Sequence, residues 1–452
     1  MDTILVAYAV LCLIAFVQVC VMFVHTFEHG RFHSSRRTSG LGRSDRQQVT
    51  LFVPCRGIDT GGERNLRALF EQRYPHFELC FVVETEAEPV VEIIRQLERQ
   101  YPGVPCRFVF AGEACVGGQK VHNLICATRT VDPKTDVLAF ADSDACPHPD
   151  WLARLVDRLH DDRHGVATGY RWYTPLAPTL ANLLLAAINN AVTGLMSSHR
   201  FNLVWGGAWA MRAATFRRLG LPDAWTGTLN DDLVVSRLVH RAGLKVAYDP
   251  HCLVTSTADV NFLGLAEFVR RQYLQVRVFV PLWWHAAFWA ASLANVMVWT
   301  SLVLAVVWAW RGGPWWVPAG YGVLYYAAVG CKIRIAANTV QPFVAVERAA
   351  FQRVWQFAVW AWPLAALANW LGLVAARLGR TIVWRGIRYR LVSYRETVIE
   401  WRTPPVPRKT APGPEAPAVR IPPVELAGAL IAPVLTDRPV ETDRNCPVQA
   451  TA

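Results

Sequence analysis

The feature that most constrains this chain is an apolar run close to its start. Residues 4–27 contain no Asp, Glu, Lys or Arg, and about 20 such residues suffice for a helix to cross the hydrocarbon core of a membrane. A cleaved signal peptide is the alternative interpretation, but no basic residue precedes the run and no small-residue cleavage site follows it. The run therefore predicts a membrane anchor, and the basic residues after it place the following chain in the cytosol.

Three further apolar runs lie at residues 288–310, 315–331 and 354–376, and the turn at 311–314 predicts that the first two form a helical hairpin. Four full crossings would leave the basic residues after Arg377 outside the cell, against the positive-inside rule. We therefore expect one run not to cross. The last contains Pro363 and is the candidate for a re-entrant or interfacial segment.

The net charge of +11 is compatible with nucleic acid, anionic lipid or phosphate-bearing substrates, and its placement separates these classes. Five arginines follow the first apolar run within residues 31–46, and nine Lys or Arg lie between Arg377 and Lys409. Both clusters adjoin apolar runs, which predicts contact with anionic lipid headgroups and no nucleic-acid partner. The tail at 404–452 is rich in Pro, Ala and Val without any period, and is expected to be disordered.

Between these membrane segments the pattern alternates between short buried strands and amphipathic helices. Such alternation predicts an α/β fold with a mostly parallel sheet covered by helices on both faces, and ligands bind at the carboxyl ends of the strands of such sheets. Acidic residues follow two of the expected strands. The strands are expected at 49–53, 79–83, 107–111 and 137–141, and the helices between them at 63–72 and 90–101.

Asp142 and Asp144 follow the strand at 137–141 directly. Residues two apart in an extended segment point the same way, so both carboxylates can face one ligand. A hard cation such as Mg²⁺ or Mn²⁺ prefers oxygen ligands and often shares them with substrate phosphates. The alternative is a turn with solvated acids.

Two glycine-containing segments are candidates for close contact with a ligand. Gly117 and Gly118 precede Lys120 at an expected helix start, an arrangement that can hold a phosphate or form an ordinary loop. Gly206 and Gly207 lie between Trp205 and Trp209, which suits a flat pocket wall for a sugar ring or a simple tight bend.

Two further candidates lie at helices. Asp231 and Asp232 open the helix at 233–242, where they either cap the helix or provide a general base for an acceptor hydroxyl. The basic helix at 268–279 carries Arg271, Gln272 and Arg277. It either lies on anionic lipid or closes over a diphosphate leaving group.

Seven stretches between about residues 49 and 390 also carry a family resemblance. They are Asn65–Leu66, Gln72–Pro75 with Phe77–Glu78, Glu84–Pro89, Gly118–Leu124, Asp142–Asp144, Asp231–Asp232 and Thr381–Leu391. In this order they resemble the inverting glycosyltransferases of families 2 and 21, most closely the ceramide glucosyltransferase type. The resemblance implies a GT-A fold, a UDP-sugar donor, a divalent metal, and a cytosolic C-terminal stretch. It implies Glu84 and Glu86 near the uridine, Lys120, Asp142 and Asp144 near the diphosphate and metal, and Asp232 as catalytic base beside Asp231.

The sequence departs from the family pattern in two places. The acids at 84–88 are glutamates where family members often have aspartate. The (Gln/Arg)-x-x-Arg-Trp motif is degraded, because Leu274 and Gln275 stand where Arg and Trp are expected. Either Arg277 one turn away substitutes, or the acceptor differs, or activity is impaired.

The expected function is transfer of a hexose, glucose first, from a UDP-sugar to a membrane lipid such as ceramide, diacylglycerol or a hopanoid. Its alternatives are a processive polysaccharide synthase and a non-catalytic nucleotide-sugar-binding membrane partner. The catalytic domain of this integral membrane protein is expected to face the cytosol. The expected segments are an anchor at 1–30, the GT-A domain at 47–262, an interfacial segment at 263–285, transmembrane or interfacial helices at 286–378, the basic segment at 379–403, and the tail.

Overall fold

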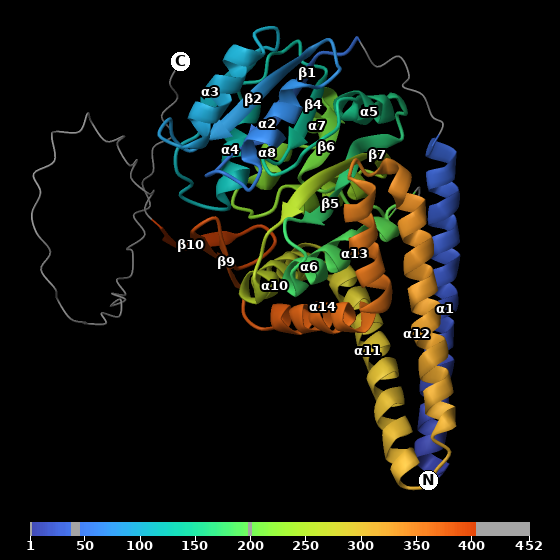
Figure 1. Cartoon of the computed structure of the whole chain (residues 1–452). Coiled ribbons are helices and arrows are strands. Elements are labelled where there is room, and N and C mark those ends of the chain that lie inside the picture. The colour runs from blue at the N-terminus through green and yellow to red at the C-terminus, as the bar shows by residue number, and fades with distance from the viewer. Residues whose placement is uncertain (1, 38–45, 198–200, 404–452) are drawn as a thin grey trace, which may run out of the picture.

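The computed structural model describes residues 2–37, 46–197 and 201–403; Arg43 and the tail at 404–452, for which disorder was expected, lie outside them. The described chain consists of a head built around a sheet and a stalk of long helices that projects from it (Figure 1).

The head contains a seven-stranded sheet with the order β3-β2-β1-β4-β6-β5-β7. Every pair is parallel except those made by β6, which runs antiparallel to both β4 and β5. This is the mostly parallel, helix-covered sheet expected for a GT-A fold. The strands are β1 (Val49–Pro54), β2 (Phe77–Val83), β3 (Cys106–Phe110), β4 (Val137–Ala141), β5 (His164–Pro175), β6 (Ala208–Arg212) and β7 (Lys245–Ala258).

The central strands are apolar without alternation because both faces of the sheet are covered. In β1, Leu51 and Val53 belong to one core cluster and Phe52 to another, and none of the three is exposed to solvent. Helices α2 (Gly62–Phe70), α3 (Val90–Gln100) and α5 (Trp151–Asp157) pack on the first face. Helices α4 (Gln119–Thr128), α7 (Ala213–Arg218), α8 (Leu221–Trp225) and α9 (Asp232–Arg241) pack on the second.

The strand order reverses direction between β1 and β4, because β2 and β3 extend the sheet on one side of β1 and β4 on the other. The loops leaving the carboxyl ends of these two strands diverge at such a point and leave a crevice where ligands bind. The chain after β1 begins at Cys55 and the chain after β4 at Asp142, so the topology itself places Asp142 in a binding crevice.

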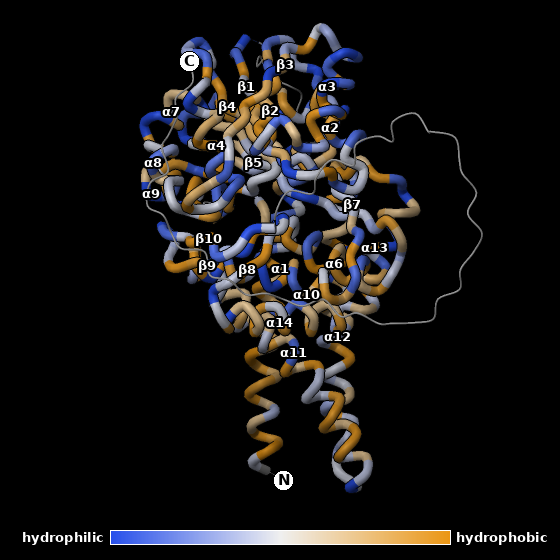
Figure 2. Tube along the Cα trace, turned by 90° about the vertical axis from the view of Figure 1, so that its left-hand side faces the viewer, coloured by the Kyte–Doolittle hydropathy of each residue, from blue (hydrophilic) through white to orange (hydrophobic). Residues whose placement is uncertain are grey.

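Helices α1 (Asp2–Arg37), α11 (Pro281–Trp310) and α12 (Trp316–Val340) run side by side as the stalk (Figure 1). Most residues of the stalk are coloured as hydrophobic in Figure 2. At 1.5 Å per residue, α11 alone is about 45 Å long, more than the ~30 Å hydrocarbon core. Trp310, Trp315 and Trp316 lie exposed around the turn between α11 and α12, where an interfacial aromatic belt is expected.

Two described helices, α1 and α11, are long and apolar enough to cross a membrane. The number of candidate spans rises to three if one bent pair of helices is counted as a single span. That pair is α13 (Arg348–Trp360) and α14 (Trp362–Arg377), which meet at an angle of 81°. Pro363 lies in the first turn of α14, where it removes a backbone donor that the preceding turn would need for a continuous helix. Helix α14 lies across the head end of the stalk (Figure 1), and the bent pair is compatible with either a broken span or a re-entrant loop.

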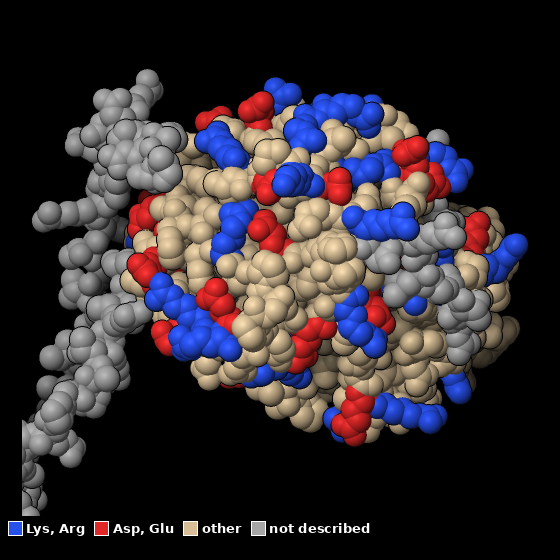
Figure 3. Space-filling view, turned by 90° about the horizontal axis from the view of Figure 1, so that it is seen from above, with Lys and Arg blue, Asp and Glu red and all other residues tan. Residues whose placement is uncertain are grey.

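Three shorter parts complete the described chain. Helix α6 (Leu180–Asn190) packs with α10 (Phe262–Phe279), α13 and α14 between head and stalk. Strands β8 (Thr381–Trp384), β9 (Ile387–Leu391) and β10 (Thr397–Arg402) form a separate antiparallel sheet against the head. On the face of the head away from the stalk, acidic and basic side chains are interspersed (Figure 3), so the positive excess is not gathered there into one patch.

We predict that the ends of the chain flanking the stalk lie on one side of the membrane. Single cysteines at Ser34 and Glu396, which are exposed beside the head, should react with an impermeant thiol reagent from the cytosolic side in a cysteine-free background. A cysteine at Arg311, in the turn at the far end of the stalk, should react only from the other side. Labelling of Ser34→Cys and Glu396→Cys from opposite sides would contradict this topology and make α13 and α14 a full crossing.

Candidate functional site

A polar cavity of about 180 Å³ opens at the carboxyl ends of β1 and β4. Most of the residues singled out in the sequence line it, together with several that were not. From the expected set come Lys120, Asp142, Asp144, Asp231, Asp232, Arg271 and Gln272; the others include Arg56, Asn123, Arg171, Trp205, Gln275, Trp384 and Arg385.

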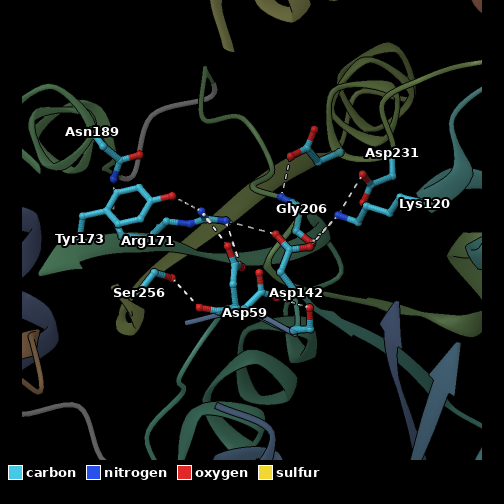
Figure 4. Close-up of polar contacts among 12 residues, drawn as sticks. Asp59, Lys120, Asp142, Arg171, Tyr173, Asn189, Gly206, Asp231 and Ser256 are labelled. Carbon is cyan, nitrogen blue, oxygen red and sulfur yellow. Dashed lines mark hydrogen bonds and ion pairs between the residues drawn. The ribbon is translucent and has the colours of Figure 1, made fainter. Parts of the chain in front are cut away.

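Asp142 and Asp144 both point to one partner, as their spacing predicted. The guanidinium of Arg171 donates to Asp142 at 3.3 Å (Figure 4) and to Asp144 at 3.2 and 3.4 Å. The other oxygen of Asp142 lies 2.8 Å from the ammonium of Lys120. Burial would raise the pKa of Asp142, but Lys120 and Arg171 outweigh it and hold that pKa below its usual value.

The carboxylate oxygens of this aspartate pair are suitable ligands for a hard divalent cation, because Mg²⁺ and Mn²⁺ prefer oxygen ligands. The four oxygens of Asp142 and Asp144 nevertheless all contact nitrogen atoms of Lys120 or Arg171. No cluster of three or more His, Cys, Asp or Glu able to hold a metal occurs in the described residues. A divalent ion at Asp142 and Asp144 would have two protein carboxylates as ligands, so oxygens of a substrate would have to supply the others.

Lys120 joins the two acidic motifs of the cavity. Its ammonium lies 2.8 Å from Asp142 and 3.2 Å from Asp231. Burial would lower the pKa of Lys120, but the surrounding aspartates raise it well above its usual value, so the side chain is a fixed positive charge. Gly117 and Gly118 do not line the cavity; their amides donate to Thr397 and Thr228, and the glycines permit this close packing.

Asp232 is the first residue of α9, and its carboxylate accepts hydrogen bonds from the amides of Gly206 at 2.6 Å and Leu233 at 2.7 Å. Such bonds favour the ionised form. Burial, followed by the negative charge of Asp231, outweighs them and raises the pKa of Asp232 to about 7. A carboxylate with that pKa is suited to remove a proton near neutral pH.

The glycine pair before β6 allows these groups to converge. A β-carbon on Gly206 would lie 2.9 Å from a carboxylate oxygen of Asp232, and one on Gly207 would lie 2.8 Å from Asp142 and overlap the indole of Trp205. Leu203 and Val204 before this glycine pair are irregular, and strand β6 begins at Ala208. Trp205 and Gly206 line the cavity. Gly207 does not line it, but its lack of a side chain leaves room for Trp205 and Asp142, which do.

The turn between β8 and β9 reaches into the cavity from the C-terminal sheet. It consists of Arg385 and Gly386, both with positive φ (51° and 73°), as a two-residue turn between antiparallel strands requires. Arg385 pairs with Asp59 at 2.5 Å, and Trp384 stacks with Arg271 at 5.6 Å. The sequence marked this stretch only as a signature, because nothing local predicts where a distant hairpin docks.

Glu84 and Glu86 have different surroundings. Glu84 is buried and pairs with Arg56 and with Arg402 of β10, so it anchors the C-terminal sheet behind the cavity wall. Glu86 is exposed on the surface and pairs with Arg95 of α3. Neither glutamate lines the cavity itself. Glu84 contacts the lining residue Arg56, whereas Glu86 has no such contact among the described residues.

A second, mostly apolar cavity of about 260 Å³ adjoins the first on the side of α6, α10 and α11. Its wall includes the partly exposed side chains of Leu195, Phe201 and Trp283 at the head end of the stalk. Six residues border both cavities. They are Arg171, Trp205, Asn230, Asp232, Gln272 and Gln275.

This geometry can be compared with known proteins. The sequence pattern described as "Glycosyl transferase family 21" matches residues 8–397, which include most of the stalk, the residues lining both cavities, and strands β8 and β9 of the C-terminal sheet. The chain belongs to glycosyl transferase family 21.

Individual relatives of this family 21 chain are distant. Ceramide glucosyltransferase 1 of Caenorhabditis elegans is 22% identical over 244 residues, which is 51% of this chain and 50% of the relative. The ceramide glucosyltransferase of Komagataella phaffii is 33% identical over 117 residues, 25% of this chain and 22% of the relative. The chain thus spans half or less of the length of these curated relatives.

Among solved structures, a mannosyltransferase from Pyrobaculum calidifontis in complex with GDP-Man and Mn²⁺ is similar, with a TM-score of 0.43 and 16% identity. That similarity covers 81% of this chain and 98% of the mannosyltransferase.

The residues of the degraded motif have different surroundings in this family 21 member. Leu274 is fully buried in the head, and Gln275 lines the cavity and accepts from Asn230 at 2.9 Å. Arg277 does not line the cavity: its guanidinium donates to the carbonyls of Arg377 and Gly379 at 2.6 and 2.7 Å. The expectation that Arg277 contacts a diphosphate therefore finds no support in its position, whereas Trp384 and Arg385 bring a Trp and an Arg into the cavity from the C-terminal hairpin.

Proposed function

We propose that this protein transfers a hexose from a UDP-sugar to the hydroxyl of a membrane lipid by a single inverting displacement. The observation that carries the proposal is the place of Asp232, whose carboxylate borders both the polar cavity and the apolar cavity. A base at that boundary can reach the hydroxyl of a lipid whose alkyl chains lie in the apolar cavity. The hydroxyl oxygen would then attack a sugar held in the polar cavity.

The polar cavity provides the donor half of the reaction. Lys120, Arg271 and Arg385 place cationic groups around it, and such groups stabilise the negative charge that gathers on a departing diphosphate. Burial lowers the pKa of Arg271 to about 10, which leaves it charged at neutral pH. Asp142 and Asp144 would hold a divalent ion, which supplies further positive charge at the diphosphate when bound.

The apolar cavity provides the acceptor half. It lies at the head end of the stalk, beside α10 and the start of α11, where a lipid can enter from the headgroup layer without leaving the membrane. The names of the curated relatives favour ceramide as acceptor and glucose as the transferred sugar. The basic residues beside the stalk are proposed to contact anionic headgroups, with the head facing the cytosol, where UDP-sugars are made.

In the reaction, the acceptor oxygen attacks the anomeric carbon from the face opposite the leaving group. The new C–O bond forms as the bond from that carbon to the diphosphate breaks, and UDP departs with the bonding electron pair. Asp232 takes the hydroxyl proton as the oxygen attacks. Asp231, held by Lys120 at 3.2 Å, keeps the base in position and adds the negative charge that raises the pKa of Asp232.

The experiment that tests this function incubates the purified full-length protein with radiolabelled UDP-glucose and a panel of ceramide, diacylglycerol and hopanoid in vesicles. A lipid carrying one hexose, with inverted anomeric configuration by NMR, supports the proposal. A polymer would instead identify a processive polysaccharide synthase. UDP-sugar binding without any product would identify the non-catalytic partner.

A further inference from the structure

Arg171 is a residue of β5 that lines both cavities and that no sequence motif singled out. Its guanidinium contacts both aspartates and also donates to the hydroxyl of Tyr173. It lies over the ring of Trp205 at 4.9 Å and the ring of Tyr173 at 5.1 Å. The Arg171 side chain is only 11% exposed. Two aromatic faces and two carboxylates therefore fix this guanidinium in one position.

The position of Arg171 bears on metal binding because its guanidinium contacts the carboxylate oxygens of Asp142 and Asp144 that a divalent ion would need as ligands. A divalent ion held by Asp142 and Asp144 must take lone pairs that now accept hydrogen bonds from Arg171. The charge balance points the same way: the two carboxylates already face the two cations Lys120 and Arg171. A further charge of +2 would be repelled by both of these cations, and Asp231, which also pairs with Lys120, offsets only part of that repulsion.

A nucleotide diphosphate changes that balance. It brings negative charge and oxygen ligands of its own, which a divalent ion shares with protein carboxylates. The same phosphate oxygens are good acceptors for a displaced guanidinium. Metal and nucleotide are then expected to bind together, each raising the affinity of the other.

We propose that Arg171 is a built-in counter-ion of the Asp142–Asp144 pair that keeps divalent metal out of the cavity until the donor diphosphate arrives. Arg171 is therefore a positioning residue that controls when a divalent metal can reach Asp142 and Asp144. It occupies the aspartates in the absence of nucleotide and turns to the diphosphate when the metal enters. The inference rests on the donor site of the proposed function and adds an order of binding to it.

The test measures Mn²⁺ binding directly, by electron paramagnetic resonance of free Mn²⁺, with the full-length protein in detergent. Wild type and Arg171→Met are compared with and without UDP, since Met keeps apolar packing against the two rings while removing the charge. Without UDP, Arg171→Met should bind Mn²⁺ at least ~10-fold more tightly than wild type. UDP should tighten Mn²⁺ binding by about 5–150-fold in wild type, the usual range of such coupling, and far less in the variant.

The control is Arg163→Met, which removes the same charge from an exposed arginine paired with Asp161 on the surface and should leave Mn²⁺ binding unchanged. Measurements at pH 7 and 8.5 separate metal binding from proton uptake by the freed carboxylates. If Arg171→Met disturbs folding, judged by thermal unfolding and near-UV circular dichroism, Arg171→Gln serves as a second neutral variant.

Equal Mn²⁺ affinity of wild type and both neutral variants in the absence of UDP would overturn the proposal. So would the absence of Mn²⁺ binding in every variant even with UDP present. The product assay is independent of these outcomes. A lipid hexoside made by a protein without the predicted coupling would leave the proposed function intact and reject the role of Arg171.

Discussion

Asp232→Asn should lose turnover by about 10²–10⁴-fold, the usual cost of removing a positioned general base, while its affinity for UDP stays close to that of wild type. The amide keeps the shape of the side chain and can still accept from Gly206, whose amide lies 2.6 Å from the carboxylate. It cannot take a proton from the acceptor hydroxyl. Single-turnover transfer and UDP binding, measured on the same preparation, separate the two effects.

The pH dependence gives an independent check on the same residue. The base must be ionised to accept a proton, and burial together with Asp231 raises the pKa of Asp232 to about 7. The value of kcat/KM for wild type should therefore rise with pH through the range below about 7 and level off above it. In Asp232→Asn this rise should disappear from the residual activity.

Asp231→Asn is the matched comparison, because it makes the same chemical change at the adjacent position. Asp231 lines only the polar cavity and is held by Lys120, so this variant should lose less activity. It should also lower the pH at which kcat/KM levels off, since the charge that raises the pKa of Asp232 is gone. A dead Asp231→Asn beside a nearly normal Asp232→Asn would mean that the two roles are exchanged. Normal activity in both variants would reject the inverting assignment.

Asp144→Ala should abolish turnover, with a loss of at least ~10²-fold, as for other preorganised electrostatic groups. Asp144 supplies one of the two carboxylates that face the proposed donor site in the polar cavity, and its backbone lies in the loop after β4. The side chain is 30% exposed, so it contributes little to the core, and the thermal unfolding midpoint should remain near that of wild type. Excess EDTA should likewise suppress turnover of the wild-type protein.

Asp150→Ala provides the control for this loss. Asp150 follows the same strand, its side chain is also 30% exposed, and it pairs with Arg73 on the surface away from the cavity. Its turnover should match that of wild type. Undiminished turnover of the wild type in EDTA, or of Asp144→Ala, would show that the aspartate pair holds no essential metal.

Much of the head was predictable because its signals are local. Strands buried on both faces are continuous apolar runs, and β1, β2, β3 and β4 lie within a residue or two of where such runs predicted them. The carboxyl ends of parallel strands meet at one edge of a sheet, which is why the order of strands and helices already placed Asp142 and Asp144 beside a ligand crevice. Residues two apart on an extended chain point the same way, and both carboxylates do contact Arg171.

Lys120, Asp231 and Asp232 line one cavity, whereas Arg277 and Glu86, which were also expected near the donor, lie outside its lining. Arg277 follows the expected helical face by periodicity, yet it caps carbonyls of the chain between α14 and β8. Glu86 continues an acidic run after β2, yet it pairs with Arg95 on the surface. Local spacing gives the direction of a side chain relative to its own element, and it does not give the rotation of that element against the rest of the fold.

By itself, then, the sequence determined the membrane anchor, the α/β sheet, and the acids at its ligand-binding edge, because each follows from a repeat or run within about twenty residues. Tertiary structure alone decided that Arg171 occupies the aspartate pair, that Trp384 and Arg385 enter the cavity from the C-terminal hairpin, and that an apolar cavity adjoins Asp232. These contacts join segments far apart in the sequence, such as Asp59 and Arg385, which are 326 residues apart. Such contacts depend on how whole elements pack, and no local pattern of residues specifies that.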